Sequence, residues 1–132
     1  MTQVRVMIVD DSPRIRAAVR ELLRNVDGCN VIAEGANGLQ ALELARTLTP
    51  DIVVMDIHMP IMNGMEAACL IKSRLPSTRI VLMTTTVEPE VREQALRNGA
   101  IACLEKGPEL WSGLAEIASL APGIASGKPA SD

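Results

Sequence analysis

Five short apolar runs alternate along the chain with segments of helical periodicity, and this alternation is the feature that most limits the fold. Short runs rich in Val, Ile and Leu are typical of buried strands, while apolar residues spaced three or four apart predict the helices between them. Such strands pair in parallel, and right-handed crossovers place helices on both faces of the sheet. We therefore expect an α/β protein of (βα)5 order. The predicted strands are residues 4–9, 31–34, 52–55, 79–83 and 101–104.

Capping residues and prolines mark the predicted helices. Ser12 precedes Pro13, which combines a hydroxyl cap with the residue best tolerated at the first helical position. Asn37 and Asn63 are each followed three residues later by Gln or Glu, as in a capping box. Pro89 starts the fourth helix. The last helix is indicated by a stripe at helical spacing: Leu110, Leu114, Ile117 and Ala121.

The composition indicates one domain with an aliphatic core. The chain has 132 residues, of which 48% are hydrophobic, and it contains neither Tyr nor Phe. A chain of this length is long enough to bury a stable core. We expect the domain to span residues 1–121. The segment 122–132 is rich in Pro, Gly, Ser and Ala without apolar periodicity, which predicts a flexible tail or the start of a linker.

Charge and cysteine usage exclude several classes of function for this segment. Its formal net charge is -3, whereas surfaces that bind nucleic-acid backbones are usually basic. Cys29, Cys69 and Cys103 are widely spaced in apolar patterns, so neither a disulfide framework nor a zinc site is indicated. No run approaches the roughly 20 apolar residues of a membrane span, and no secretory leader is recognisable. We expect a soluble, cytoplasmic protein.

Charged residues stand at the ends of three predicted strands. Asp10 and Asp11 follow the first run, Asp56 follows the third, and Lys106 follows the fifth. Because parallel strands end at one edge of their sheet, these side chains should gather where open α/β sheets bind ligands. Three carboxylates in a partly desolvated site repel one another, which favours either a raised pKa or a bound divalent cation. We expect the cation.

Four separated elements, taken together, resemble a known family. They are Val9-Asp10-Asp11-Ser12, the run MDIHMPIMNG at residues 55–64, Thr84 and Lys106. In this order, each at the end of a predicted strand, they resemble the receiver (REC) domain of bacterial two-component response regulators. The similarity covers about residues 4–120. It implies a flavodoxin-like three-layer sandwich whose five parallel strands lie in the order 2-1-3-4-5.

The resemblance also implies how phosphorylation would occur. Asp56 would accept a phosphoryl group from a sensor histidine kinase or a phosphotransfer protein, forming an acyl phosphate. Mg²⁺ would be bound by Asp11, Asp56 and the backbone carbonyl of His58. Asp10 would lie beside the metal and act through water or through contacts with its ligands.

Two further residues would contact the phosphoryl group, by the same resemblance. Lys106 would neutralise phosphoryl charge, and the Thr84 hydroxyl would hydrogen-bond a phosphoryl oxygen once one is present. Thr84 would then sense whether the site is occupied. The output partner that responds is not named by the sequence.

Each of these assignments has a structural alternative. A carboxylate that closes a buried strand, as Asp56 does, often marks only the exit to solvent or caps a helix. Lys106 could simply extend from an apolar strand with its amine in water. Thr84 belongs to a run of three threonines, and a lone histidine in a loop, such as His58, is more often solvated than catalytic. The coincidence of four elements favours the functional interpretation.

Two positions depart from the family pattern. Receivers commonly carry Tyr or Phe three residues before the lysine, where ring rotation accompanies movement of the switch hydroxyl, but this chain has Cys103. The lysine is usually followed by a cis proline, whereas Gly107 here separates Lys106 from Pro108. A cis bond without proline is costly, so we expect a lysine loop of different shape and a switch without an aromatic ring.

The favoured function is a phosphoacceptor switch of a two-component phosphorelay that changes conformation to regulate a partner and is not itself an enzyme. A second interpretation makes the chain the receiver part of a longer DNA-binding transcriptional regulator. A third is a Mg²⁺-dependent phosphohydrolase or a flavodoxin-like binding protein, because a fold does not fix function. No glycine-rich phosphate loop follows the first strand to support the third.

Overall fold

The computed structural model describes residues 3–125, in which strands and helices alternate throughout. None of the helices in this range combines the length and the apolar character that crossing a bilayer requires. The strands are β1 (Val4–Val9), β2 (Cys29–Gly35), β3 (Ile52–Asp56), β4 (Arg79–Thr84) and β5 (Ala102–Glu105). The helices are α1 (Pro13–Arg24), α2 (Gly38–Leu48), α3 (Gly64–Arg74), α4 (Pro89–Arg97) and α5 (Pro108–Ala125).

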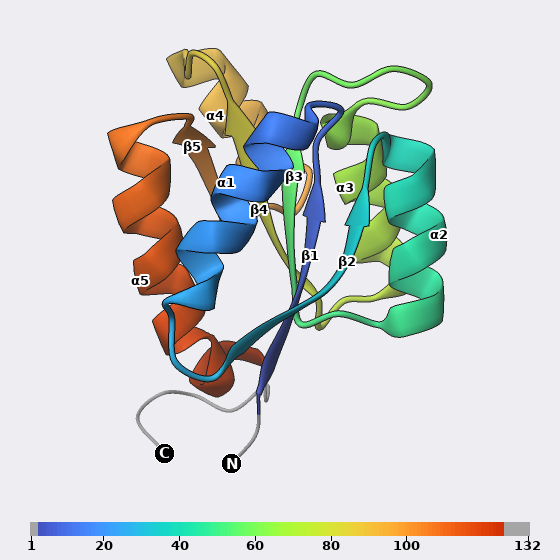
Figure 1. Cartoon of the computed structure of the whole chain (residues 1–132). Coiled ribbons are helices and arrows are strands. Elements are labelled where there is room, and N and C mark those ends of the chain that lie inside the picture. The colour runs from blue at the N-terminus through green and yellow to red at the C-terminus, as the bar shows by residue number, and fades with distance from the viewer. Residues whose placement is uncertain (1–2, 126–132) are drawn as a thin grey trace.

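The strands form one parallel sheet in the order β2-β1-β3-β4-β5, which confirms the expected (βα)5 topology (Figure 1). Val9 at the end of β1 pairs with Met55 of β3, and Asp56 pairs with Met83 of β4. The last residue of β4 is Thr84. The strands therefore end together at one edge of the sheet, which is the upper edge in Figure 1.

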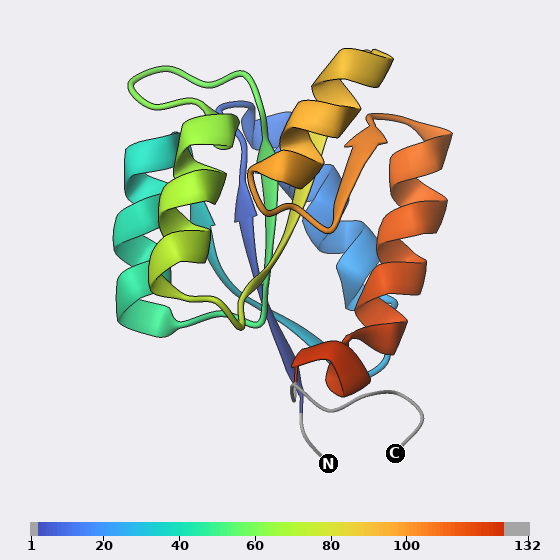
Figure 2. The same cartoon turned by 180° about the vertical axis from the view of Figure 1, so that it is seen from behind.

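Helices cover both faces of the sheet (Figures 1 and 2). α1 and α5 pack on one face, and α2, α3 and α4 pack on the other. Because side chains alternate along a strand, β3 serves both cores: Ile52 and Val54 join the first, whereas Val53 and Met55 join the second. All four are fully buried. This two-sided burial is the physical reason why the central strand is a continuous apolar run.

Two of the predicted helix caps are confirmed in full. The Ser12 hydroxyl accepts a hydrogen bond from the backbone N–H of Ile15 at 3.3 Å, and Pro13 follows at the first helical position. Asn63 and Glu66 form a reciprocal capping box at the start of α3. These caps fix where the chain turns from the sheet edge into α1 and α3.

The cap of α2 differs from its prediction in one bond. Asn37 accepts a hydrogen bond from the N–H of Gln40 at 2.9 Å, as expected. The Gln40 side chain accepts from the N–H of Ala36 at 2.8 Å and not from that of Asn37. Only half of a capping box therefore forms at α2.

Several element boundaries differ from those expected: β3, β4 and β5 differ by one residue, and the differences at β2 and α5 are larger. β2 begins at Cys29, before the expected residue 31, because Cys29 and Asn30 pair with β1. α5 continues to Ala125, so the first part of the expected tail, residues 122–125, is helical. Pro122 and Gly123 are poor helix formers, so the local sequence did not indicate this extension. Residues 126–132 lie outside the described range, and the role of 122–132 as a linker stays a prediction.

Candidate functional site

Three carboxylates meet at the carboxyl edge of the sheet. Asp10 and Asp11 follow β1, and Asp56 is the last residue of the adjacent strand β3. One carboxylate oxygen from each residue lies within 4.8 Å of the other two. Asp10 is fully buried and Asp56 is 5% exposed, whereas Asp11 is open to solvent. The cluster therefore has two inner carboxylates and one that faces water.

Asp10 is held by contacts on each of its oxygens. Its Oδ1 accepts a hydrogen bond from the N–H of Ser12 at 2.9 Å, and its carbonyl accepts one from Arg16 Nη1 at 2.6 Å. Its Oδ2 makes no hydrogen bond within residues 3–118 but lies 2.9 Å from Lys106 Nζ. We regard this contact as an ion pair, because Coulomb attraction depends on separation and not on hydrogen direction.

Lys106 bridges the two inner carboxylates. Its Nζ lies 2.9 Å from Asp10 Oδ2 and 3.4 Å from Asp56 Oδ1. Burial of the ammonium lowers the pKa of Lys106, but the close contacts with the carboxylates of Asp10 and Asp56 outweigh burial, so the pKa is raised overall. The backbone N–H of Lys106 donates to the carbonyl of Thr84 at 2.8 Å, which anchors the lysine to the end of β4. The amine is therefore a fixed positive charge.

Neighbouring groups shift the pKa of the Asp56 carboxyl in opposite directions. Burial raises its pKa most, and the charge of Asp10 raises it further. The ammonium of Lys106 and a hydrogen bond from the backbone N–H of His58 lower the pKa, but not enough to cancel the increase. The neighbouring groups of the protein therefore do not fully stabilise the ionised form of Asp56, and an added positive charge would stabilise it further.

Thr84 and His58 lie at the same edge in different settings. Thr84 ends β4 and is buried, with 2% of its surface exposed, whereas the His58 side chain is exposed in the loop after β3. The structure thus brings Thr84, Lys106 and the carboxylates to one edge, and it leaves the imidazole in solvent. Their chemical roles stay predictions.

The donor set fits a hard divalent cation. Asp10, Asp11 and Asp56 all offer carboxylate oxygen, which Mg²⁺ prefers. A buried Asp10 oxygen accepts no hydrogen bond in the described part of the chain, and burial together with repulsion from Asp10 raises the pKa of Asp56. A cation on these oxygens would relieve that repulsion, and water could complete its coordination on the exposed side of Asp11.

A close backbone approach keeps α3 against the end of β3. The N–H of Gly64 donates to the carbonyl of Ile57 at 2.7 Å. A Cβ at Gly64 would overlap the carbonyl oxygen of Asp56, so only glycine fits this position without a shift. The N–H of Ile57 in turn donates to the carbonyl of Met83 at 2.9 Å. Asp56 is therefore presented by backbone that is fixed on both sides.

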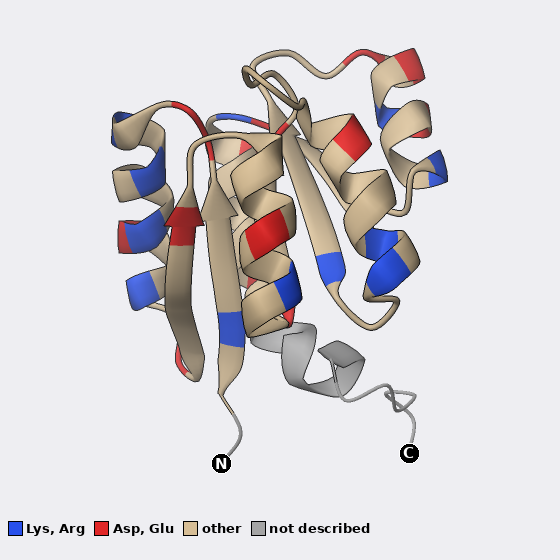
Figure 3. Cartoon of the chain, turned by 90° about the vertical axis from the view of Figure 1, so that its right-hand side faces the viewer, with Lys and Arg blue, Asp and Glu red and all other residues tan. Residues whose placement is uncertain are grey.

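Sequence reasoning missed the contribution of Arg16. Its guanidinium donates to the carbonyl of Asp10 and pairs with Glu34 of β2 at 3.3 Å, which ties α1 to the acidic loop. Figure 3 shows basic positions recurring along α1, but a basic helix face alone does not reveal which arginine turns inward. The bond goes to a backbone carbonyl, which has no sequence pattern of its own.

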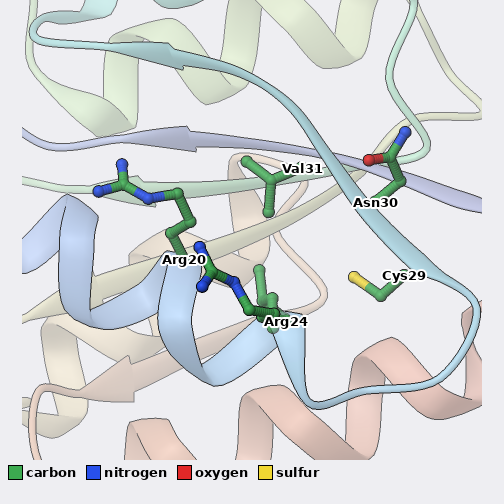
Figure 4. Close-up of a pocket in the computed structure, with 6 residues that line it drawn as sticks. Arg20, Arg24, Cys29, Asn30 and Val31 are labelled. Atoms are coloured by element: carbon green, nitrogen blue, oxygen red, sulfur yellow. The ribbon is translucent and has the colours of Figure 1, made fainter.

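A recess of about 260 Å³ between α1 and β2 is separate from this site (Figure 4). It lies beside the start of β2, at the opposite end of the sheet from Asp56. Its two guanidinium groups are already ion-paired, Arg20 with Glu34 and Arg24 with Glu21. The recess is lined by Arg20, Leu23, Arg24, Cys29, Asn30 and Val31. It therefore offers no unpaired charge to a ligand.

Comparison with known proteins identifies the family. The model of the response regulator receiver domain matches residues 6–114. The chain belongs to the response-regulator receiver family. This receiver resembles a solved two-component response regulator of the LuxR family from Aurantimonas, with a TM-score of 0.83 and 31% identity, covering 96% of this chain and 88% of that one. Receiver membership thus rests on sequence and fold together.

The relatives of this receiver are longer proteins with different outputs. It is 40% identical over 103 residues to the transcriptional regulatory protein LnrK of Bacillus subtilis, covering 78% of this chain and 47% of LnrK. It is also 40% identical over 110 residues to protein-glutamate methylesterase/protein-glutamine glutaminase 4 of Myxococcus xanthus, covering 80% of this chain and 31% of that enzyme. The shared region is therefore the receiver and not a particular output.

Proposed function

We propose that this receiver is a phosphoacceptor switch of a two-component phosphorelay, in which Asp56 takes a phosphoryl group from a histidine kinase or a phosphotransfer protein. The observation that carries the proposal is the position of Asp56: a nearly buried carboxylate at a strand end, beside Asp10 and 3.4 Å from Lys106. A structural aspartate at a strand exit needs neither neighbour. In this role the chain acts as a switch and not as an enzyme.

The chemical step is a displacement at phosphorus. An ionised Asp56 oxygen attacks, the new P–O bond forms as the P–N bond breaks, and the donor imidazole leaves as a neutral ring when its other nitrogen carries a proton. Lys106 stabilises the negative charge that spreads over the phosphoryl oxygens. Thr84 then donates its hydroxyl hydrogen to one of them, which gives the phosphorylated state a contact that the free state lacks.

Mg²⁺ is the cofactor that we propose for this site. Asp11, Asp56 and the backbone carbonyl of His58 would hold the ion, and Asp10 would lie beside it and hold Lys106. When bound, the ion supplies positive charge that offsets repulsion between the carboxylates and an incoming phosphoryl group. We propose a cytoplasmic location, because the protein donor is phosphorylated by ATP. We also propose that this segment neither binds nucleic acid directly nor inserts into a membrane.

A second candidate function places the same switch within a longer regulator. It is favoured by coverage, since the chain spans only 47% of LnrK and 51% of the response regulator GacA of Pseudomonas viridiflava. In that case an output domain, such as a DNA-binding one, would follow the segment 122–132. Sequencing the full reading frame distinguishes the two, because only the second predicts a further domain downstream.

The test of the proposed function is labelling by acetyl phosphate, a small acyl-phosphate donor. We expect stoichiometric, Mg²⁺-dependent labelling of the wild-type chain and none of Asp56→Asn, which preserves the shape of the side chain. Asp27→Asn is the matched control, because Asp27 is exposed in the turn after α1. Full labelling of Asp56→Asn would remove Asp56 from the mechanism, and repeated turnover of a free phosphoester would favour a phosphohydrolase.

A further inference from the structure

The loop between β1 and α1 is held mainly through Asp10. It consists of Asp10, Asp11 and Ser12. The Asp10 N–H donates to the carbonyl of Gly35 at 3.0 Å, and the Asp10 carbonyl accepts from Arg16 Nη1 at 2.6 Å. The Asp11 side chain is exposed, and no hydrogen bond or ion pair holds it among the side chains that the structure describes. The position of the Asp11 carboxylate therefore depends on the backbone of the loop.

The hydrogen bond from Arg16 acts on the peptide group that joins Asp10 to Asp11. A peptide group is planar, so the Asp10 carbonyl and the Asp11 N–H can only turn together. A guanidinium on the carbonyl restrains this plane, and the plane sets the direction from which the Asp11 side chain leaves the backbone. One side chain of α1 therefore helps to place the exposed carboxylate of the cluster.

Glu34 of β2 orients the guanidinium that makes this bond. Arg16 Nε lies 3.3 Å from Glu34 Oε1 while Nη1 reaches the Asp10 carbonyl, so one rigid planar group makes both contacts. The Arg16 and Glu34 side chains are 20% and 27% exposed, whereas those of the surface pair Arg24 and Glu21 are 68% and 65% exposed. Water therefore screens the contact of Arg16 less than an ordinary surface ion pair.

We propose that Arg16 is a positioning residue for the phosphoacceptor site: through the Asp10 carbonyl it places Asp11, and it thereby raises the affinity of the site for the divalent cation. This inference rests on the proposed function, in which Asp11 is a direct ligand. The contacts of Arg16 are with the Asp10 carbonyl and with Glu34, so it acts through the backbone. Groups that orient metal ligands in this indirect way typically change metal affinity about 10- to 100-fold.

The geometry and the charge of Arg16 predict opposite effects on the cation. A positive guanidinium beside the site repels a cation, so removing its charge would by itself tighten the binding of Mg²⁺. Losing the bond to the Asp10 carbonyl would instead weaken it. The sign of the change therefore separates positioning from electrostatics. Arg20 is the matched comparison, because it also pairs with Glu34 from α1 but bonds only that carboxylate within the described part of the chain.

The experiment measures Mg²⁺ binding to the full chain by titration calorimetry in Arg16→Gln and Arg20→Gln. Each variant loses one positive charge and one contact with Glu34. We expect the dissociation constant of Arg16→Gln to rise about tenfold, whereas that of Arg20→Gln should not rise. Arg16→Lys keeps the charge but lacks the planar group that makes both contacts, so its dissociation constant should rise by a smaller factor. Urea unfolding establishes that each variant is folded.

Labelling by acetyl phosphate gives a second readout. In Arg16→Gln the Mg²⁺ concentration that gives half the maximal rate should rise by the same factor as the dissociation constant. The rate at saturating Mg²⁺ should stay near that of the wild type, because Asp56 and Lys106 are unchanged. A loss of stability alone would not produce this separation, since the folded chain would keep its affinity for the cation.

An unchanged or lower dissociation constant in Arg16→Gln would overturn the inference. An equal rise in Arg20→Gln would also overturn it, because the effect would then belong to Glu34 and not to the Asp10 carbonyl. Wild-type affinity in Arg16→Lys would do the same, and this variant decides the question if Arg16→Gln does not fold. Absence of both Mg²⁺ binding and Asp56 labelling in the wild type would overturn the proposed function itself, and the positioning role with it.

Discussion

At the scale of single residues, the site depends on an imbalance of charge. Two carboxylates, Asp10 and Asp56, share one ammonium, that of Lys106, in a setting that is largely closed to water. The sequence could predict that these residues meet, because each follows a strand of the same sheet. It could not predict that Asp10 is buried while Asp11 is exposed, since this depends on the turn in which the Ser12 N–H bonds Asp10.

This imbalance predicts how Asp56 affects stability without metal. Because its pKa is raised in the folded chain, protonation of Asp56 favours folding. That contribution is complete below the ordinary value of 3.8 and is lost as pH rises through the folded pKa. Asp56→Asn should therefore melt at a higher temperature than wild type near pH 7 in chelator, and the difference should shrink toward about pH 4.

Thermal unfolding across this pH range, with Asp27→Asn as the surface control, measures the effect. Asp27 is exposed, so its substitution should leave a difference from wild type that is nearly independent of pH in the same window. A wild type that is as stable as Asp56→Asn at neutral pH would show that Lys106 and the His58 N–H fully compensate the carboxylate.

Substitutions of the two aspartates after β1 should affect different properties, metal binding for Asp11 and stability for Asp10. Asp11→Ala should weaken Mg²⁺ binding more than Asp10→Ala, because only Asp11 is proposed as a direct ligand. Asp10→Ala should instead lower the free energy of unfolding by about 1–3 kcal/mol, since it removes the buried acceptor of the Ser12 N–H and the ion-pair partner of Lys106. Metal titration and urea unfolding test the pair. Equal metal affinities in the two variants would contradict the ligand assignment.

At the scale of elements, local sequence rules account for most helix starts. Ser12 and Asn63 cap their helices as expected because a cap is a bond between near neighbours. The rules fail where distant backbone decides: β2 is lengthened by pairing with β1, and the turn at Ile61 is fixed through Gly38 of α2. Neither contact has a signal within its own segment.

The elements around Cys103 are joined by polar contacts where the family pattern has an aromatic ring. Arg92 of α4 donates from Nε and Nη2 to the carbonyl of Cys103, at 3.3 Å each, and from Nη2 to Glu109 of α5 at 2.8 Å. Cys103 itself is buried, and burial raises the pKa of its thiol. Arg92 thus links α4, β5 and α5 without a ring.

We predict that the contacts of Arg92 contribute little to global stability but restrict local opening of α4. The Arg92 and Glu109 side chains are each nearly half exposed, and exposed ion pairs contribute about 0–1 kcal/mol. Arg92→Ala should therefore change global stability by less than about 1 kcal/mol while increasing amide hydrogen exchange in α4 relative to α2. Arg97→Ala is the matched control, because its partner Glu93 lies on α4 itself. Equal exchange in the two variants would contradict a linking role for Arg92.

The same surface is where we expect phosphorylation to be read out. Capture of a phosphoryl oxygen by Thr84 would act on the loop that leads to α4. In this loop the backbone N–H of Val87 donates a hydrogen bond to the carboxylate of Glu105 of β5 at 3.2 Å. Backbone chemical shifts between Thr84 and Trp111 should therefore change on phosphorylation. Trp111 is half-buried against the core under α1 and α5, so its fluorescence is the less direct reporter. Unchanged shifts would exclude this surface.

At the scale of the whole molecule, the fold was predictable because pattern and topology agree. Five apolar runs separated by helices allow few arrangements once crossovers are right-handed, and the aliphatic composition supplies both layers of core. Site geometry was predictable only to the edge of the sheet. Which charges pair there, such as Lys106 with Asp10 at 2.9 Å, depends on side-chain positions that no spacing encodes.

Because the acidic edge is part of the folded chain and is dispersed on unfolding, Mg²⁺ should stabilise the whole domain by mass action. At a concentration 100 times its dissociation constant, a ligand that binds only the folded state contributes about 2.7 kcal/mol. For a domain of this size that corresponds to a rise in melting temperature of roughly 10 °C. Asp11→Ala should show a smaller rise, since it removes one of the three clustered carboxylates.

Sodium chloride at matched ionic strength is the control for this measurement. Salt alone screens the repulsion between Asp10 and Asp56, but screening is weak for buried charges, so its effect on the melting temperature should be much smaller than that of Mg²⁺. Equal rises with both salts would mean that the cluster is only screened. A larger rise with Mg²⁺ that is lost in Asp11→Ala would mean that the carboxylates bind the ion directly.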